Sequence, residues 1–262
     1  MRLSKTSRIV IGLMTAFVLL VIYAPLAVVA INSLNSNRNM VWPPPGFTTG
    51  WWVTAFHSAG LWDAVLTSVE VAVSATAVAI VLGTLVAMAL NRYRFFGKSV
   101  VSLLVVLPIA LPGIVTGIAL NNGFRTILGA QLGMATLIIA HATFCVVTVY
   151  NNVMARLARV NVNLADASAD LGAGLWTTFR LVTFPQIRSA LFAGGLLAFG
   201  LSFDEIIVTT FTAGPGTTTL PIWILDNMFR PGQAPVVNVI AVVLVITSAV
   251  PIYFAQRLSN QD

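Results

Sequence analysis

The chain has 262 residues, of which 58% are hydrophobic and only 8% are charged, whereas soluble domains average about 25% charged residues. Several apolar runs continue for about 20 residues with almost no charge, which is the length that a helix needs to cross a bilayer. This composition excludes a soluble core, and the lack of strict polar and apolar alternation in those runs excludes a membrane β-barrel. We therefore expect an all-α integral membrane protein.

Six apolar runs are long enough to be transmembrane helices. We expect one transmembrane domain over residues 1–262, with spans at residues 9–31, 63–90, 100–120, 134–153, 189–211 and 236–256. The first run follows a short basic stretch, as the apolar part of a signal peptide does, but it is long enough to span and has no clear small-residue cleavage site. We interpret it as an uncleaved helix.

The Lys and Arg residues predict the orientation, because basic loops stay on the cytoplasmic side of a membrane. With a cytoplasmic N-terminus and six crossings, all but three of the fourteen basic residues fall on the inside, the exceptions being Arg38, Arg125 and Arg230. We therefore expect both termini in the cytoplasm. The net charge of +6 then reflects this topology and contact with anionic membrane lipid, and no nucleic-acid partner is expected.

Two of the connections are longer than simple turns. The outside connection, residues 32–62, contains Trp-Pro-Pro-Pro-Gly at residues 42–46 and then Trp51-Trp52. A stiff polyproline stretch followed by an aromatic pair predicts that part of this segment lies along the membrane surface. The inside connection, about residues 155–188, is called the elbow loop below. It alternates polar and apolar residues at roughly helical spacing, and we expect it to be where the chain can meet a soluble partner.

The elbow loop is expected to form two short helices joined by a glycine turn. Residues 164–173 read Leu-Ala-Asp-Ala-Ser-Ala-Asp-Leu-Gly-Ala, and residues 179–185 read Phe-Arg-Leu-Val-Thr-Phe-Pro. Gly172 suits the left-handed conformation that ends a helix, and Pro185 fits near a helix start. The small side chains around them allow another surface to approach closely.

At these residues the chain resembles the cytoplasmic loop of binding-protein-dependent ABC importer permeases. The pattern of that family is Glu-Ala-Ala, three residues, Gly, and then Leu-Pro about a dozen residues later. Here Asp166 stands in place of the Glu, Ser168 in place of the second Ala, and Phe184 in place of the Leu. The spacing of the pattern is retained.

The resemblance implies that the elbow loop forms the coupling helix, which docks into an ATPase subunit and transmits its closure to the membrane helices. The residues that it assigns to ATPase coupling are Asp166, Ala167, Ser168, Asp170, Leu171, Gly172, Ala173 and Pro185. It implies the type I ABC importer permease fold in the bacterial cytoplasmic (inner) membrane. It also implies three kinds of partner: two copies of an ABC ATPase, a second homologous permease or a second copy of this chain, and an extracytoplasmic solute-binding protein.

The same resemblance places the chemistry outside this chain. ATP and Mg²⁺ would bind to the partner ATPase, so neither a cofactor nor a catalytic residue is expected here. Gly97-Lys98-Ser99 looks like the end of a phosphate-binding P-loop, but Arg92 stands where that motif needs its first Gly. His57 and His141 are too isolated to form a metal site.

The resemblance covers nearly the whole chain, including Leu-Pro-Gly-Ile-Val-Thr-Gly at residues 111–117 of the third span. A narrower resemblance, to permeases of the spermidine/putrescine type, rests on Ser-Phe-Asp-Glu-Ile at residues 202–206. Thr-Ala-Gly-Pro at residues 212–215 and Thr-Leu-Pro at residues 219–221 extend it. It implies a polyamine solute, and the alternative is another small solute carried by a related permease.

Three acids lie within the predicted spans and away from their ends, namely Glu70, Asp204 and Glu205. A charge at the bilayer centre costs roughly 2.5–3.5 kcal/mol on insertion scales, so such residues usually face a cavity or a partner. We expect them to line the solute pathway and to attract the ammonium groups of a polyamine, with Trp223 offering a cation–π contact. Two alternatives stay open. Ser202 and Glu205 have the spacing of a capping box that would start a new helix where the fifth span breaks, and Glu70 could pair with another subunit.

The third span has two interpretations of its own. Gly113 and Gly117 form a Gly-x-x-x-Gly face that permits close helix packing, whereas Pro108 and Pro112 remove backbone donors and allow a bend. Packing is the preferred interpretation, and a hinge for alternating access is the other. The lone thiol of Cys145 is interpreted as a small packing residue.

Two other classes of function fit a six-span protein. The first is a secondary transporter driven by an ion gradient through the buried acids. Its usual signs are an internal repeat and two broken helices in corresponding positions, and we find no convincing repeat. The second is a membrane scaffold without a transport role.

Overall fold

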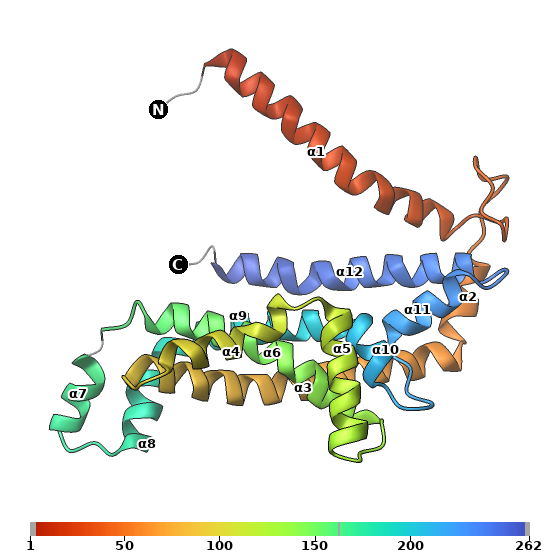
Figure 1. Cartoon of the computed structure of the whole chain (residues 1–262). Helices are drawn as coiled ribbons and strands as arrows, with labels where there is room; N and C mark the ends of the chain where they lie inside the picture. The colour runs from red at the N-terminus through yellow and green to blue at the C-terminus, as the bar shows by residue number, and fades with distance from the viewer. Residues whose placement is uncertain (1–3, 162, 260–262) are drawn as a thin grey trace. The chain divides into compact units, whose positions relative to one another are not determined.

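Every regular element in the described part of the chain is a helix or a helical turn, as Figure 1 shows. The computed structural model describes residues 4–161 and 163–259, and the side chains of these as far as Ser248. The only strand-like pairing in that part is one isolated antiparallel bridge between Asn35 and Phe47. The all-α prediction is confirmed.

The helices run in the following order along the chain. They are α1 (Lys5–Asn32), α2 (Gly50–Phe56), α3 (Ala59–Arg92), α4 (Lys98–Ala110), α5 (Gly113–Asn122), the π-helical turn η1 (Gly123–Ile127), α6 (Met134–Leu157), α7 (Asn163–Asp170), α8 (Leu175–Thr178), the π-helical turn η2 (Phe179–Thr183), α9 (Phe184–Phe203), α10 (Ile207–Thr212), α11 (Leu220–Met228) and α12 (Ala234–Ser259).

Four continuous helical stretches are long and apolar enough to cross a membrane: Lys5–Asn32, Ala59–Arg92, Met134–Leu157 and Leu175–Phe203. The bent pair α4 and α5 makes a fifth span if it is counted as one. Helix α12 contains the predicted sixth span, but its described apolar stretch, Ala234–Ser248, is shorter than a full crossing, and the rest of the span lies outside the residues whose side chains are described. The predicted number of six spans therefore stays a prediction.

The helices divide into two units, each described by itself. One unit is residues 1–61 with 224–262, and the other is residues 62–223. In the first unit α12 contacts both α1 and α2, and none of the side chains of α1 is buried. An apolar helix without a buried face needs an apolar solvent, and this fits a helix whose side chains face lipid.

The outside connection in the first unit is folded back on itself and is not an extended rod. The side-chain amide of Asn35 donates to the backbone oxygen of Val41 at 3.1 Å, and the indole N–H of Trp51 donates to the backbone oxygen of Asn35 at 2.8 Å. The guanidinium of Arg38 lies 5.8 Å from the ring centre of Trp51. These contacts tie the loop to the start of α2, which carries the predicted aromatic pair.

Helix α6 is the centre of the second unit. It packs most extensively against α9 and also contacts α4 and α10. Glycines allow close approach on two sides: a Cβ on Gly83 of α3 would lie 2.9 Å from the backbone oxygen of Val146, and a Cβ on Gly194 of α9 would lie 3.3 Å from Cα of Val149. Because helices in lipid associate through such close packing, α3, α6 and α9 form one tightly packed group.

The third predicted span is not one helix. Helix α4 and the helical stretch Gly113–Ile127 meet at an angle of 106°, so the bend that the prolines allow is present within residues 100–120. Leu111, which precedes Pro112, has an extended backbone with ψ of 146°, because the proline ring disfavours a helical conformation in the residue before it. Pro108 is accommodated inside α4, so the break comes from Pro112.

The glycines of this span pack, as the preferred interpretation predicted. A Cβ on Gly117 would lie 2.7 Å from the ring of Phe211, and one on Gly113 would lie 3.5 Å from Ile207. Helix α5 therefore lies directly against α10.

The fifth predicted span, residues 189–211, is also broken. Helix α9 ends at Phe203, α10 begins at Ile207, and the three residues Asp204–Ile206 between them are called the acid turn below. The continuous helix was wrong and the break offered as the alternative is present, because the two acids fit a turn in an apolar segment better than a continuous apolar helix. Both broken spans meet where α5 contacts α10.

Candidate functional site

Helix α7 begins and ends with well-formed caps. The side-chain oxygen of Asn161 accepts the N–H of Asn163 at 3.0 Å. At the other end Gly172 has φ of +81°, its N–H donates to Ala169, and the N–H of Ala173 donates to Ser168 at 3.1 Å. This pair of bonds is the Schellman motif that ends helices at a left-handed glycine. The predicted conformation of Gly172 is confirmed.

The rest of the elbow loop is fixed by side-chain contacts. The hydroxyl of Ser168 lies 3.0 Å from that of Thr178, which ties α7 to α8. The Nε–H of Arg156 donates to the backbone oxygen of Gln186 at 2.8 Å, which closes the base of the loop between the end of α6 and the start of α9. Pro185 lies in the first turn of α9, as predicted. Figure 1 shows α7 and α8 at one end of the second unit and α10 towards the other.

The elbow loop exposes large apolar side chains on both sides of the Gly172 turn. Leu171 is 89% exposed, Leu175 80% and Trp176 70%. The acids Asp166 and Asp170 are exposed beside them. Contiguous apolar side chains on an exposed surface indicate contact with a partner.

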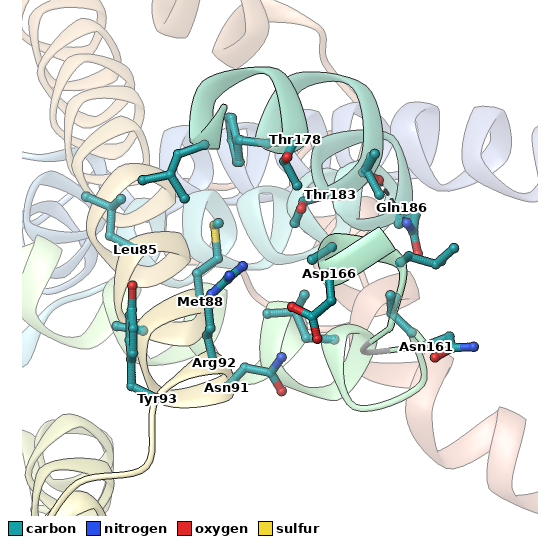
Figure 2. A pocket seen from close by; sticks show the side chains of 18 of the residues that line it. Leu85, Met88, Asn91, Arg92, Tyr93, Asn161, Asp166, Thr178, Thr183 and Gln186 are labelled. Carbon is teal, nitrogen blue, oxygen red and sulfur yellow. Dashed lines mark hydrogen bonds between the residues drawn. The ribbon is translucent and has the colours of Figure 1, made fainter. Parts of the chain in front are cut away.

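A cavity of about 800 Å³ lies between the elbow loop and the end of α3. Its walls are mainly apolar, and Figure 2 shows Asp166 of α7 and Arg92 of α3 among the polar side chains that line it. Asn91 near the end of α3 and Tyr93, directly after that helix, also line this cavity. A cavity of this size accommodates a small ligand or the side chains of a partner.

The four residues assigned to the pathway lie on different elements. Glu70 is exposed on α3, roughly three turns from its start. Asp204 is exposed at the end of α9, where its N–H donates to Gly200 at 3.2 Å. Trp223 is half-buried in α11.

Glu205 acts as a helix cap in the structure. Its Oε1 accepts the N–H of Val208 at 2.8 Å, which satisfies a free donor in the first turn of α10. Ser202 is not the partner that the capping box requires, because it lies inside α9 and its hydroxyl contacts His141. The capping alternative is therefore present for Glu205 and wrong for Ser202.

His141 is a residue that the sequence interpretation passed over. It is fully buried in α6, and both ring nitrogens have hydroxyl partners: Nδ1 lies 2.8 Å from the Ser202 oxygen and Nε2 lies 2.9 Å from the Thr209 oxygen. The signal that could have found it is its position, since an ionisable residue in the middle of an apolar span is rare and usually functional. No group of three metal-ligating side chains occurs among the described residues.

The single cysteine of the chain, Cys145, packs between two helices. Cys145 is fully buried, and its Sγ–H donates to the backbone oxygen of Ala198 at 3.3 Å, so it lies between α6 and α9.

Comparison with known proteins gives the family. Residues 79–262 match the family described as "Binding-protein-dependent transport system inner membrane component". The chain belongs to this family. It is thus a multi-pass permease of the inner membrane, and the resemblance seen in the elbow loop is confirmed.

The most similar relatives include two permeases of polyamine transport systems. The spermidine/putrescine transport system permease protein PotC of Escherichia coli K12 is 36% identical over 250 residues, which is 95% of this permease and 93% of PotC. The putrescine transport system permease protein PotI of the same strain is 34% identical over 230 residues, covering 85% and 81%. The putative 2-aminoethylphosphonate transport system permease protein PhnV of Salmonella typhimurium LT2 is 28% identical over 249 residues, covering 93% of each.

A solved structure has the same fold. It is the crystal structure of a bacterial ABC transporter involved in the import of the acidic polysaccharide alginate. One of its chains matches this permease with a TM-score of 0.78 and 14% identity over 98% of this chain and 99% of that one. The predicted ABC importer permease fold is confirmed.

Proposed function

We propose that this permease is a membrane subunit of an ATP-driven ABC importer of polyamines. The observation that carries the proposal is the elbow loop, in which the apolar Leu171 and the acids Asp166 and Asp170 are exposed on a short helix that the Gly172 turn ends. Two ABC ATPase copies would dock on it, with their ATP and Mg²⁺, and the cavity beside Asp166 leaves room for an ATPase side chain. A second permease and a solute-binding protein would complete the transporter.

The packing of the second unit supports this coupling. The elbow loop joins α6 to α9, and these two helices pack extensively against each other. A rigid displacement of the loop would move both helices, because packed cores transmit strain and do not deform continuously. ATP binding would close the ATPases, move the elbow loop and switch the pathway from inward-facing to outward-facing.

The chemistry of the relatives' solutes supports an amine substrate. Spermidine, putrescine and 2-aminoethylphosphonate, which the names of PotC, PotI and PhnV give, all carry an amine that is protonated at neutral pH. The exposed carboxylate of Asp204 at a break between two helices would attract such a cation, and broken helices commonly line the solute sites of transporters. Glu70, Glu205 and Trp223 are proposed as further pathway residues.

The proposal is tested by uptake into proteoliposomes that contain this permease with its ATPase, second permease and binding protein. Radiolabelled putrescine and spermidine are compared with 2-aminoethylphosphonate and with an uncharged sugar. We expect ATP-dependent uptake of at least one polyamine and none of the sugar. Uptake of 2-aminoethylphosphonate alone would contradict the polyamine assignment.

The two broken spans favour one rival function, the ion-driven secondary transporter. The same vesicles separate the two mechanisms. Ionophores that abolish all ion gradients are expected to leave uptake unchanged as long as ATP is present. Uptake that needs a gradient and not ATP would show that the permease is a secondary transporter.

A further inference from the structure

The imidazole of His141 connects three helices inside the second unit. It lies in the first half of α6, is fully buried, and contacts one hydroxyl on α9 and one on α10. The two hydroxyls lie on either side of the acid turn: Ser202 two residues before Asp204, and Thr209 three residues after Ile206. His141 is thus the side chain through which α6 holds both flanks of this turn.

The hydrogen bonds around His141 have one consistent direction. The hydroxyl of Thr209 donates its single proton to the backbone oxygen of Glu205 at 2.8 Å, so towards His141 it acts as an acceptor. The Nε2–H therefore donates to Thr209, and in the neutral imidazole Nδ1 then accepts the proton of the Ser202 hydroxyl. A continuous chain runs from Ser202 through the imidazole and Thr209 to the backbone of the acid turn.

The other bonds of the acid turn lie within its own stretch of chain. The N–H of Asp204 donates to Gly200, Glu205 caps α10, and the backbone oxygen of Ile206 accepts from Thr210. Helix α10 has only six residues, and a helix of that length is not stable by itself. Neighbouring helices hold it in place through Asn121, which donates to the backbone oxygen of Phe211, and Thr136, which donates to that of Thr212 at 3.1 Å. These two bonds hold the second half of α10, whereas His141 binds Thr209 in its first half and also connects it to α9 through Ser202.

We propose that His141 is a positioning residue that holds the acid turn, and with it the Asp204 carboxylate, in the geometry required for solute translocation. The inference rests on the proposed function, since it concerns the same pathway. His141 is fully buried and does not contact the solute in this arrangement. Its role is to fix where Asp204 lies.

The test uses the complete transporter in proteoliposomes and measures solute moved per ATP hydrolysed in purified, assembled complexes. Replacing His141 with leucine removes both hydrogen bonds. We expect the ratio of solute moved to ATP hydrolysed to fall about tenfold, which corresponds to a free-energy change of ~1.4 kcal/mol. H141Q keeps one donor and one acceptor at the end of its side chain and is expected to transport more than H141L. The matched control is Thr143→Val, since the Thr143 hydroxyl bonds only to Ala140 in its own helix, and we expect it to behave as the wild type.

Two further variants separate positioning from general stability. Ser202→Ala and Thr209→Val each break one link of the chain, and combining either of them with H141L is expected to add no further loss, because members of one network are not additive. A wild-type ratio in assembled H141L would overturn the inference. If H141L does not assemble, a wild-type ratio in both Ser202→Ala and Thr209→Val would overturn it. The proposed function fails separately, if the wild-type transporter itself moves no polyamine.

Discussion

Replacing Gly172 with valine is expected to lower the solute transported per ATP hydrolysed by about tenfold or more. Gly172 has φ of +81°, a left-handed conformation that costs residues with a Cβ roughly 1–2 kcal/mol and is least accessible to β-branched ones. Nothing lies within 4 Å of the position of its missing Cβ, so the effect comes from the backbone and not from a clash. The turn that ends α7 would open, and Leu171 would lose its position on the docking surface. Uptake and ATP hydrolysis measured in the same vesicles give the ratio.

The same substitution two residues away is the matched control. Gly174 also has open space around it, but its φ of −70° and ψ of 165° suit valine. We expect Gly174→Val to couple ATP hydrolysis to uptake as the wild type does, and Gly172→Asn to fall between the two, because asparagine tolerates the left-handed conformation. Full transport by Gly172→Val would count against the docking role of the elbow loop.

Asp204→Asn is expected to reduce polyamine uptake by about tenfold, or ~1.4 kcal/mol. The substitution keeps the shape of the side chain and removes its charge. Two opposite charges 4 Å apart interact with ~4 kcal/mol at an effective dielectric constant of about 20, and we expect less here because Asp204 is exposed. The measurement is the initial rate of uptake over a range of polyamine concentrations. Unchanged apparent affinity and rate would remove Asp204 from the pathway.

The neighbouring acid provides the comparison. In Glu205→Gln the amide oxygen can still accept the N–H of Val208, so the cap on α10 is kept while the charge is lost. If Asp204 supplies the main attraction, Glu205→Gln loses less uptake than Asp204→Asn. An equal loss in both would instead indicate that the two acids act together on the solute.

The sequence predicted the helical class and most of the spans because long apolar runs have a single stable structure in lipid. The sequence did not predict exactly where the third and fifth spans break. Pro112 was recognised as a possible bend, yet whether a proline kinks a helix or divides it depends on packing, and here α5 turns to lie against α10. The acid turn was foreseen only as an alternative, since a pair of acids in an apolar run fits either a pathway or a cap.

The elbow loop was easier to predict than the pathway because its signals are local. Gly172 and Pro185 determine their own backbone conformation, so their places in the structure follow from their residue types. His141 was passed over because its partners lie 61 and 68 residues away, and nothing near His141 in the chain shows which helices pack around it. Two broken helices are a usual sign of a secondary transporter, and two broken spans are present here. Because the chain belongs to a family of binding-protein-dependent permeases, broken helices do not by themselves distinguish the two classes of transporter.

Cross-linking at Leu171 tests most directly whether the elbow loop is the docking site of the ATPase. The native thiol of Cys145 is fully buried, so a cysteine at Leu171, which is 89% exposed, would be the reactive one. A matched cysteine replaces Ile127, which is 82% exposed and lies in η1 on the predicted outer side. In the complete transporter we expect Leu171→Cys to cross-link to the ATPase through a short bifunctional reagent, and Ile127→Cys not to do so. Two results together would contradict this docking site. The first is a cysteine at position 171 that reacts freely but does not cross-link to the ATPase, and the second is polyamine uptake by vesicles that contain this permease alone.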